Sequence, residues 1–316
     1  MNSKTKPEIK KGKGIGNKKD LIFCILMVLV PTIQFLIFYI YTNINSVLLS
    51  FQEYDSITGQ YSFSGINNFQ KVFKELYNDI FVLKNGYYFY SLKNSFLVYV
   101  FGTIIGVTFS LLFSYAIFKK TFAHGFFRVV LFLPSIISPI VMVLIFKYFV
   151  DSFIPDIASK LFGKEMLGLL ADGDTALFTL IFYAIWINFG VNVLMYTSAM
   201  SGINESQIEA GQIDGATNIQ EFFHIILPNV YPTMVTFLIV GISGFFVNQM
   251  GLFSFYGEKA PIKLSTFGYY LYAKTYSAGL GNYPELSALG LIFSLITIPI
   301  TFLFRYILNK VGPSVE

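Results

Sequence analysis

The sequence predicts an all-α, polytopic membrane protein with six transmembrane helices. Of the 316 residues, 54% are hydrophobic, 18% aromatic and only 13% charged, whereas an average soluble domain is about 25% charged. The mean hydropathy is +0.62. Crossing about 30 Å of hydrocarbon takes roughly 20 apolar residues, and windows of this kind lie at 21–43, 95–118, 127–150, 176–199, 232–254 and 286–308.

The basic residues predict how the chain is oriented in the membrane. The net charge is +4, and a Lys-rich tail over 1–19 contributes much of the positive charge. This modest balance predicts a cytoplasmic tail and no nucleic-acid partner. Further basic residues gather on the side of that tail, so both termini are expected in the cytoplasm: Lys119, Lys120, Arg128, Arg305 and Lys310.

The first apolar run, within 20–50, follows the tail and lacks a small-residue cleavage site, which predicts a retained transmembrane helix. Outside the membrane this topology leaves 51–90, 151–175 and 255–285, whose mixed apolar and polar composition favours short interfacial helices packed on the spans. The remaining core domain covers 91–310. The one cysteine, Cys24, excludes an intrachain disulfide and a cysteine metal site.

Four prolines lie inside predicted spans and predict kinks, because each removes a backbone donor that neighbouring helices must replace: Pro31, Pro134, Pro139 and Pro299.

An acidic loop follows the fourth span. The stretch 204–228, NESQIEAGQIDGATNIQEFFHIILP, holds four carboxylates and no Lys or Arg, although cytoplasmic loops usually attract positive charge. Glu205 and Glu209 are four residues apart, on one face of a first helix. Gly215 predicts a tight turn. A second helix then begins at one of two capping boxes, Thr217 to Gln220 or Asn218 to Glu221, and Pro228 is expected to end it.

The second helix carries an apolar stripe at helical spacing, formed by Ile219, Phe222, Phe223 and Ile226. The loop is therefore either a docking device or a solvated connection. No Lys or Arg occurs between Lys164 and Lys259, so its carboxylates must face water, a distant cytoplasmic lysine or another chain.

Catalytic signatures are missing from the sequence. A phosphate-binding loop would end in Gly-Lys-Ser/Thr, but Gly12-Lys13 is followed by Gly14 and Gly163-Lys164 by Glu165. The two histidines, His124 and His224, have no nucleophile at a meaningful spacing. Ion-coupled transporters usually place ionisable residues deep in their spans, and here Lys147 comes nearest to such a position. We therefore expect no enzyme and no ion coupling.

Uncharged polar and aromatic residues mark a candidate substrate path. Hydroxyl groups of a sugar need neutral donors and acceptors, and a sugar ring can rest on an aromatic face. The competing interpretation is that the amides bridge helices, where such hydrogen bonds average about 0.6 kcal/mol. The candidates lie in the fourth and fifth spans: Trp186, Asn188, Gly190, Asn192, Ser243, Asn248 and Gln249.

The stretch EAGQIDGATNIQEFFHIILPNVYP resembles the EAA loop of ABC-importer permeases. Gly211 departs from the family pattern, which usually has Ala there, and this could loosen the first helix by up to about 1 kcal/mol. The positions that match are Glu209, Ala210, Asp214, Gly215, Ala216, Phe222, Ile225, Leu227, Pro228 and Pro232.

The likeness covers roughly 20–310. The stretches FSGINNFQKVF, SLKNSFLVYVFGTIIGVTFSLLFSYAIF and FFRVVLFLPSIISPIVMVLIFKYFV resemble the carbohydrate-uptake branch, in particular maltose-transporter-type permeases. The resemblance implies the ABC importer type I permease fold in a bacterial plasma membrane. It also implies that loop 201–228, with Glu205, forms a coupling helix in a cleft of a cytoplasmic ATPase.

The same resemblance implies the other parts of the importer. These are a second homologous permease, two ATPase subunits that use ATP and Mg²⁺, and an extracytoplasmic sugar-binding protein; the chain itself would bind no cofactor. Two alternatives stay open on the residues alone. One is a secondary transporter or channel that works without partners, and the other is a membrane scaffold.

Overall fold

The computed structural model describes residues 18–163 and 165–313, so most of the predicted basic tail lies outside the described residues. The helices of the first half are α1 (Lys18–Phe35), α2 (Thr42–Ser50), α3 (Asn67–Tyr77), α4 (Tyr87–Phe101), α5 (Thr108–Phe118), α6 (His124–Ile136), α7 (Pro139–Tyr148) and α8 (Ile154–Phe162). Those of the second half are α9 (Ala176–Ser201), α10 (Glu205–Ile213), α11 (Asn218–Glu221), α12 (Leu227–Ser243), α13 (Leu252–Tyr256), α14 (Phe267–Ser277) and α15 (Tyr283–Val311).

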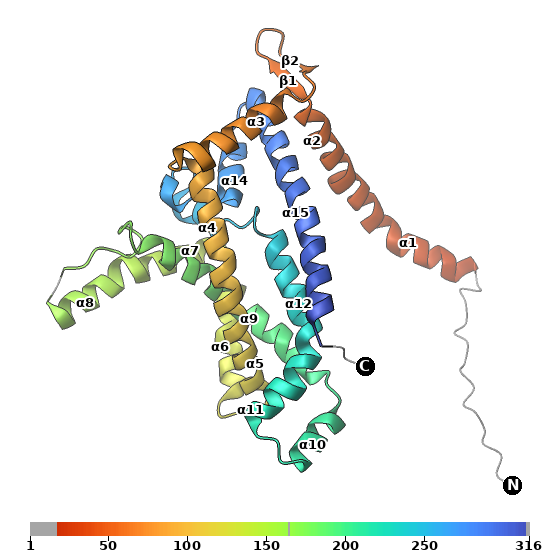
Figure 1. The fold of residues 1–316 in the computed structure, drawn as a ribbon, viewed down its shortest axis with the longest axis vertical. Helices are drawn as coiled ribbons and strands as arrows, with labels where there is room; N and C mark the ends of the chain where they lie inside the picture. The colour runs from red at the N-terminus through yellow and green to blue at the C-terminus, as the bar shows by residue number, and fades with distance from the viewer. Residues whose placement is uncertain (1–17, 164, 314–316) are drawn as a thin grey trace.

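Among the described residues, five continuous helical stretches are long and apolar enough to cross a membrane. Several comprise two α-helices joined by a π-helical turn, such as Gly102–Val107 between α4 and α5. Figure 1 shows α4, α5, α12 and α15 upright in the body, while α1 leans away from it. The stretches are Leu21–Ser50, Tyr87–Phe118, Ala176–Ser201, Asn218–Ser243 and Leu280–Val311.

The span predicted over 127–150, with kinks expected at Pro134 and Pro139, is bent much more sharply than a kink. The chain bends by 106° between His124–Ile136 and Pro139–Phe162, and α7 and α8 run out sideways in Figure 1. Ser138 has ψ 131°, which is the extended conformation that the ring of a following proline imposes. Pro139 therefore breaks the helix instead of kinking it, and a sixth crossing is present only if this bent pair counts as one.

The fifth span also differs from its prediction of 232–254, because the helix runs over Asn218–Ser243. Pro228 does not end the second loop helix: it follows a π-helical turn, Phe222–Ile226, within the same continuous helix. A π-turn already lacks the regular i−4 hydrogen bonds, so the missing proline donor disrupts less there. Beyond Ser243 the backbone turns, with left-handed φ at Met250 and Gly251.

The segment 51–90 contains a β-hairpin as well as the expected helical structure. Strands β1 (Gln52–Asp55) and β2 (Gln60–Phe63) pair antiparallel. The Asp55 carboxylate accepts hydrogen bonds from the Ile57 amide at 2.8 Å and the Thr58 hydroxyl at 2.9 Å, and this side-chain turn closes the hairpin. In α3, the Lys71 Nζ lies 2.8 Å from Glu285 Oε2 of α15. The carboxylate raises the pKa of the Lys71 ammonium.

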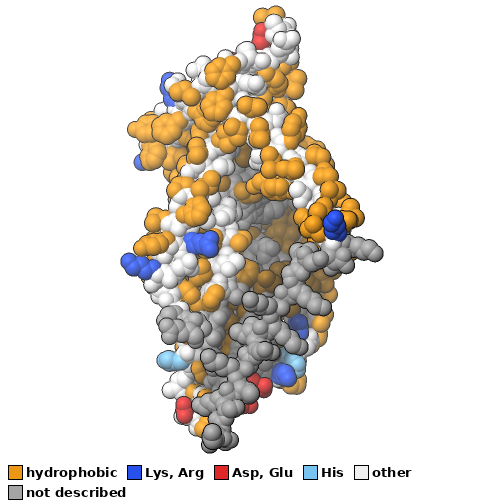
Figure 2. Space-filling view, turned by 90° about the vertical axis from the view of Figure 1, so that its right-hand side faces the viewer, with side chains coloured by type: hydrophobic (Ala, Val, Ile, Leu, Met, Phe, Trp, Pro, Cys, Tyr) orange, Lys and Arg blue, Asp and Glu red, His pale blue; other side chains and the backbone are white. Residues whose placement is uncertain are grey.

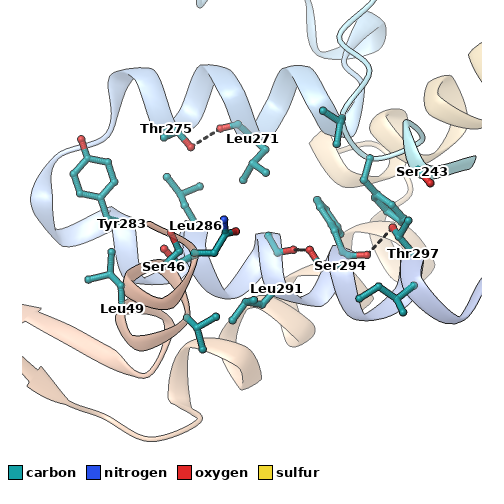
Figure 3. A pocket seen from close by; sticks show the side chains of 18 residues that line it. Ser46, Leu49, Ser243, Leu271, Thr275, Tyr283, Leu286, Leu291, Ser294 and Thr297 are labelled. Atoms are coloured by element: carbon teal, nitrogen blue, oxygen red, sulfur yellow. Dashed lines mark hydrogen bonds between the residues drawn. The ribbon is translucent and has the colours of Figure 1, made fainter. Parts of the chain in front are cut away.

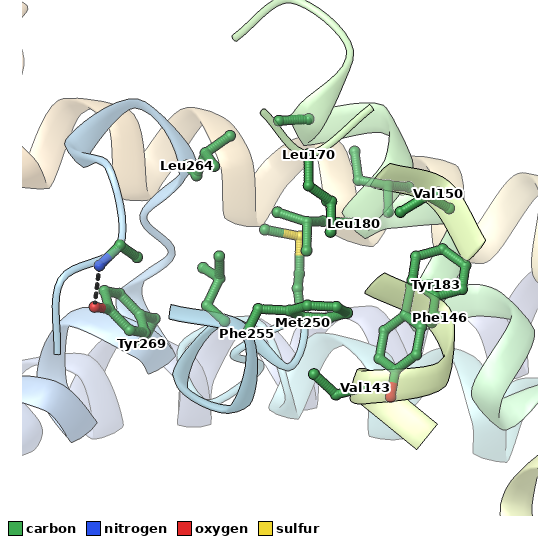
Figure 4. Close-up of a cluster of buried hydrophobic side chains, with 14 of the residues drawn as sticks. Val143, Phe146, Val150, Leu170, Leu180, Tyr183, Met250, Phe255, Leu264 and Tyr269 are labelled. Carbon is green, nitrogen blue, oxygen red and sulfur yellow. Dashed lines mark hydrogen bonds between the residues drawn. The ribbon is translucent and has the colours of Figure 1, made fainter. Parts of the chain in front are cut away.

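The largest buried cluster of the described residues is mainly aliphatic and contains an aromatic cluster formed by Phe146 of α7, Tyr183 of α9 and Phe255 of α13 (Figure 4). The Phe146 ring lies 4.9 Å from that of Tyr183 and 6.1 Å from that of Phe255, measured between centroids. This packing fixes the N-terminal half of α9 against its neighbours.

The surface agrees with a membrane environment. Hydrophobic side chains cover much of the face in Figure 2, while most of its acidic side chains gather at the lower end, level with α10 and α11 in Figure 1.

Candidate functional site

The acidic loop folds as a helix, a glycine turn and a second helix. Asn204 caps α10 by accepting from the Ser206 amide at 3.1 Å. Of the two candidate capping boxes, Thr217 with Gln220 forms: the Thr217 amide donates to Gln220 Oε1 at 2.9 Å, and the Gln220 amide to Thr217 Oγ1 at 3.4 Å. Gly215 has φ +80°, a conformation that favours glycine. Local sequence signals therefore define this loop.

The outer face of the loop combines negative charge with apolar side chains. Glu205, Glu209 and Asp214 are exposed, and among the described residues none of the three has an ion-pair partner. Three large apolar side chains are also exposed there: Ile213 at 86%, Ile219 at 71% and Phe223 at 56%. Of the other predicted coupling residues, Ala210 is exposed, while Ala216, Leu227 and Pro228 are half-buried.

The predicted apolar stripe divides between two faces. Phe222 and Ile226 are buried in a cluster with Leu111 of α5 and Met200 of α9, whereas Ile219 and Phe223 point outward. The inner pair holds the loop to the membrane helices, which leaves the outer pair available for a partner.

Glu221 differs from the other carboxylates of the loop because it is buried. Its side chain is 2% exposed and its Oε2 lies 3.0 Å from the Nζ of Lys119, the residue after α5. The Tyr115 hydroxyl donates to Glu221 Oε1 at 3.2 Å. A lysine far away in the sequence is thus the partner of this one acid.

Gly211, the departure from the family pattern, lies against the second helix. A Cβ at this position would come 2.5 Å from Ile225 Cδ1. The glycine therefore allows α10 to approach the helix that starts at Asn218.

Three of the predicted substrate-path residues lie close together, and two of them, Asn188 and Asn248, are exposed. Asn192 of α9 and Asn248, in the turn after α12, line both of two neighbouring cavities, of about 170 and 110 Å³, and Asn188 lines the smaller one. No charged side chain of the described residues lines either cavity. The sequence interpretation missed Ser95, Tyr99 and Thr103, which also line the larger cavity and recur every four residues on one helix face.

The other predicted path residues lie elsewhere. Trp186 packs in the aromatic cluster, 5.9 Å from Phe146 between ring centroids. Gly190 lies against the backbone of Leu131, with no room for a Cβ, so it serves the packing of α9 on α6. Gln249 is half-buried in the turn after α12 and lines neither cavity.

Ser243 borders a separate groove of about 660 Å³ between α2, α14 and α15 (Figure 3). The hydroxyls of Thr275, Ser294 and Thr297 along this groove donate to carbonyls of their own helices. Its polar atoms are therefore largely satisfied without a ligand.

Comparisons with known proteins agree with this architecture. Residues 99–316 match the family described as "Binding-protein-dependent transport system inner membrane component". The sn-glycerol-3-phosphate transport system permease protein UgpA of Pectobacterium atrosepticum is 26% identical, covering 91% of this chain and 94% of UgpA. The arabinooligosaccharides transport system permease protein AraP of Bacillus subtilis is also 26% identical, covering 86% of this chain and 83% of AraP.

A further relative, the multiple sugar-binding transport system permease protein MsmF of Streptococcus mutans, is 24% identical over 85% of this chain and 89% of MsmF. The fold is similar to a chain in the crystal structure of a bacterial ABC transporter involved in the import of the acidic polysaccharide alginate. The TM-score is 0.75 at 18% identity, with 94% of this chain and 98% of that chain covered. Together the family match and the helical architecture show that the chain belongs to the inner-membrane components of binding-protein-dependent transport systems.

Proposed function

We propose that this chain is the permease subunit of an ATP-driven importer for a carbohydrate, and more narrowly for an oligosaccharide. The observation that carries the proposal is the uncharged polar cavity at which Asn188, Asn192 and Asn248 meet. It lies in a chain whose family supplies the membrane component of importers that depend on binding proteins.

The chemistry of the cavity suits a neutral polyol. Amides offer both donors and acceptors, and the ring of Tyr99 lines the larger cavity beside Asn192. The names of AraP and MsmF refer to oligosaccharides and to multiple sugars, which supports a sugar. UgpA is named for sn-glycerol-3-phosphate, but a phosphate ester favours Arg or Lys partners, and no described cation lines either cavity.

The acidic loop would couple the permease to an ATPase subunit. Exposed Glu205, Glu209 and Asp214 complement a basic cleft and give specificity, while Ile219 and Phe223 offer apolar side chains that a partner can desolvate. ATP and Mg²⁺ would bind to two ATPase subunits. In this proposal the chain has no catalytic residue and binds no cofactor of its own.

A second homologous permease would complete the substrate path, because the cavities formed here by a single chain are small. An extracytoplasmic sugar-binding protein would dock on the side of the β-hairpin and α3, and both termini would lie in the cytoplasm with loop 201–228. One solved relative of similar fold, with a TM-score of 0.70, is a complex with alginate pentasaccharide-bound periplasmic protein.

Purification from native membranes in mild detergent tests the proposal. We expect an ATPase and a second permease to co-purify with the chain. In vesicles with the ATPase facing the lumen and the loaded binding protein outside, labelled oligosaccharide should accumulate only when ATP is enclosed in the lumen. Solute uptake by the chain alone would contradict the proposal and favour a transporter that works without partners.

A further inference from the structure

Glu221 connects the coupling loop to the helix that lines the polar cavity. Its two carboxylate oxygens lie 3.1 and 3.0 Å from the Nζ of Lys119. The Tyr115 hydroxyl donates to Glu221 at 3.2 Å and is also 3.0 Å from the Asn218 carbonyl oxygen. Among the described residues this is the only ion pair that joins loop 201–228 to the rest of the protein.

The partners of Glu221 belong to the same continuous helix as the cavity. Tyr115 lies in the stretch Tyr87–Phe118, and Lys119 follows it directly. Thr103, further along that helix, lines the larger cavity. Thr103 and Lys119 are 16 residues apart in the sequence, which corresponds to about 24 Å along a helix at 1.5 Å per residue. A displacement of the loop can therefore reach the cavity through one continuous helical stretch, which enters the π-helical turn Gly102–Val107 at the cavity.

The two kinds of contact at this joint resist different movements. Phe222 and Ile226 pack against Leu111, and apolar packing of this kind is non-directional. It opposes compression but leaves side chains free to slide. The paired oxygens of Glu221 add charge-assisted hydrogen bonds, which are short and directional. They fix the register of the loop against α5, so the loop can also pull on the helix.

A role in stability alone accounts poorly for an ion pair whose acid is buried, as Glu221 is here. Replacing such a pair with well-packed apolar residues is often neutral or stabilising, and setting a register or switch is its best-attested use. The remaining acids of the loop, Glu205, Glu209 and Asp214, are exposed on its outer face. The loop thus separates an outward docking surface from one inward attachment point.

We propose that Glu221, held by Lys119 and Tyr115, is a positioning residue that transmits movement of the coupling loop to helix Tyr87–Phe118 and so to the polar cavity. The inference rests on the proposed function, since it takes the loop as the ATPase contact. It predicts that breaking the pair separates the nucleotide state of the ATPase subunits from the accessibility of the cavity.

Cysteine labelling in the assembled complex tests this without knowledge of the substrate. Thr103→Cys is introduced after Cys24→Ser removes the native thiol, and a membrane-impermeant maleimide is the probe. In the complex with Glu221 and Lys119 intact, trapping ADP with vanadate and Mg²⁺ should change the labelling rate of Thr103→Cys about fivefold or more. Glu221→Gln keeps the size of the side chain and an acceptor for Tyr115 but removes the charge.

In the Glu221→Gln complex we expect vanadate-trapped ADP to persist while the labelling rate no longer responds to it. The exchanged pair Glu221→Lys with Lys119→Glu should restore the response, and Lys119→Arg should retain it. Should the Gln variant fail to assemble, the exchanged pair decides: a restored response supports the proposal, and an assembled but unresponsive complex overturns it.

Three further outcomes separate this inference from the proposed function. If the Glu221→Gln complex traps ADP and its labelling rate responds as in the complex with Glu221 intact, the positioning role of Glu221 is refuted. The proposed importer function is then unaffected. If the complex with Glu221 and Lys119 intact traps no nucleotide, the proposed function fails and the inference fails with it. If this complex traps nucleotide without any change in labelling, the inference alone is overturned.

Discussion

Gly211 of α10 faces Ile225 so closely that a Cβ would lie 2.5 Å from the Cδ1 atom of that isoleucine. The glycine is thus matched to its neighbour across the loop. An alanine would favour the helix by about 1 kcal/mol but would force the end of the Ile225 side chain to move.

The first prediction concerns this pair. Gly211→Ala alone should change stability little, because the helix gain and the displaced Ile225 oppose each other. In an Ile225→Val background, which lacks the Cδ1 atom, the same substitution should stabilise by about 1 kcal/mol. Thermal unfolding of the purified complex checks this when the unmodified protein, the two single variants and the double variant are compared. Equal effects in both backgrounds would show that the contact is absent.

The turn at Gly215 gives the second prediction. Its amide donates to the Gln212 carbonyl at 3.1 Å and its φ is +80°, whereas proline has no N–H and requires φ near −65°. Gly215→Pro should abolish transport while the subunit still inserts. Gly215→Asn is the control, because asparagine tolerates left-handed φ. Transport is measured in vesicles. A rate in the Gly215→Pro variant equal to that of the unmodified protein would refute the coupling role of the turn.

The third prediction distinguishes a packing role of Gly190 from contact with the substrate. A Cβ at Gly190 would clash with the Leu131 backbone, and overpacking typically costs about 1–3 kcal/mol. Gly190→Ala should therefore lower the unfolding temperature. Gly290→Ala in α15, where a Cβ meets nothing within 4 Å, should not lower it. A transport defect in Gly190→Ala without loss of stability would instead place this residue in the path.

The cavity amides give the fourth prediction. Asn192 lines both cavities, whereas the Asn188 amide donates to the Ala184 carbonyl of its own helix at 3.0 Å. Asn192→Ala should reduce oligosaccharide uptake by about tenfold, as expected for one lost hydrogen-bonding partner, and Asn188→Ala by less. Uptake measured at saturating binding protein distinguishes the two variants. Unchanged uptake in both would contradict the proposed path.

Local chemistry made the coupling loop predictable. Thr217, Gln220 and Gly215 act within a few residues of one another, so their spacing identifies the capping box and the turn. The sequence could not tell that Glu221 is buried and Glu209 exposed, because the difference depends on Lys119, about a hundred residues away in the chain.

Hydropathy located most membrane helices but not their breaks. The apolar run continues past Ser243, yet the backbone turns there and the Asn248 side chain accepts from the Met250 amide at 2.9 Å. Helix α9 is apolar on nearly all sides, so only its neighbours decide that Asn192 faces the cavity while Trp186 faces Phe146. The spacing of Ser95, Tyr99 and Thr103 was a usable signal that the interpretation missed.

The most direct test of the importer and its coupling loop is the ATPase activity of the purified complex in lipid, with and without binding protein loaded with candidate oligosaccharides. We expect that one sugar stimulates hydrolysis and that Glu209→Lys removes the stimulation. Glu165→Lys, a charge reversal at an exposed acid outside the loop, should preserve it. Stimulation that persists in Glu209→Lys, or the absence of any co-purifying ATPase, would contradict this expectation.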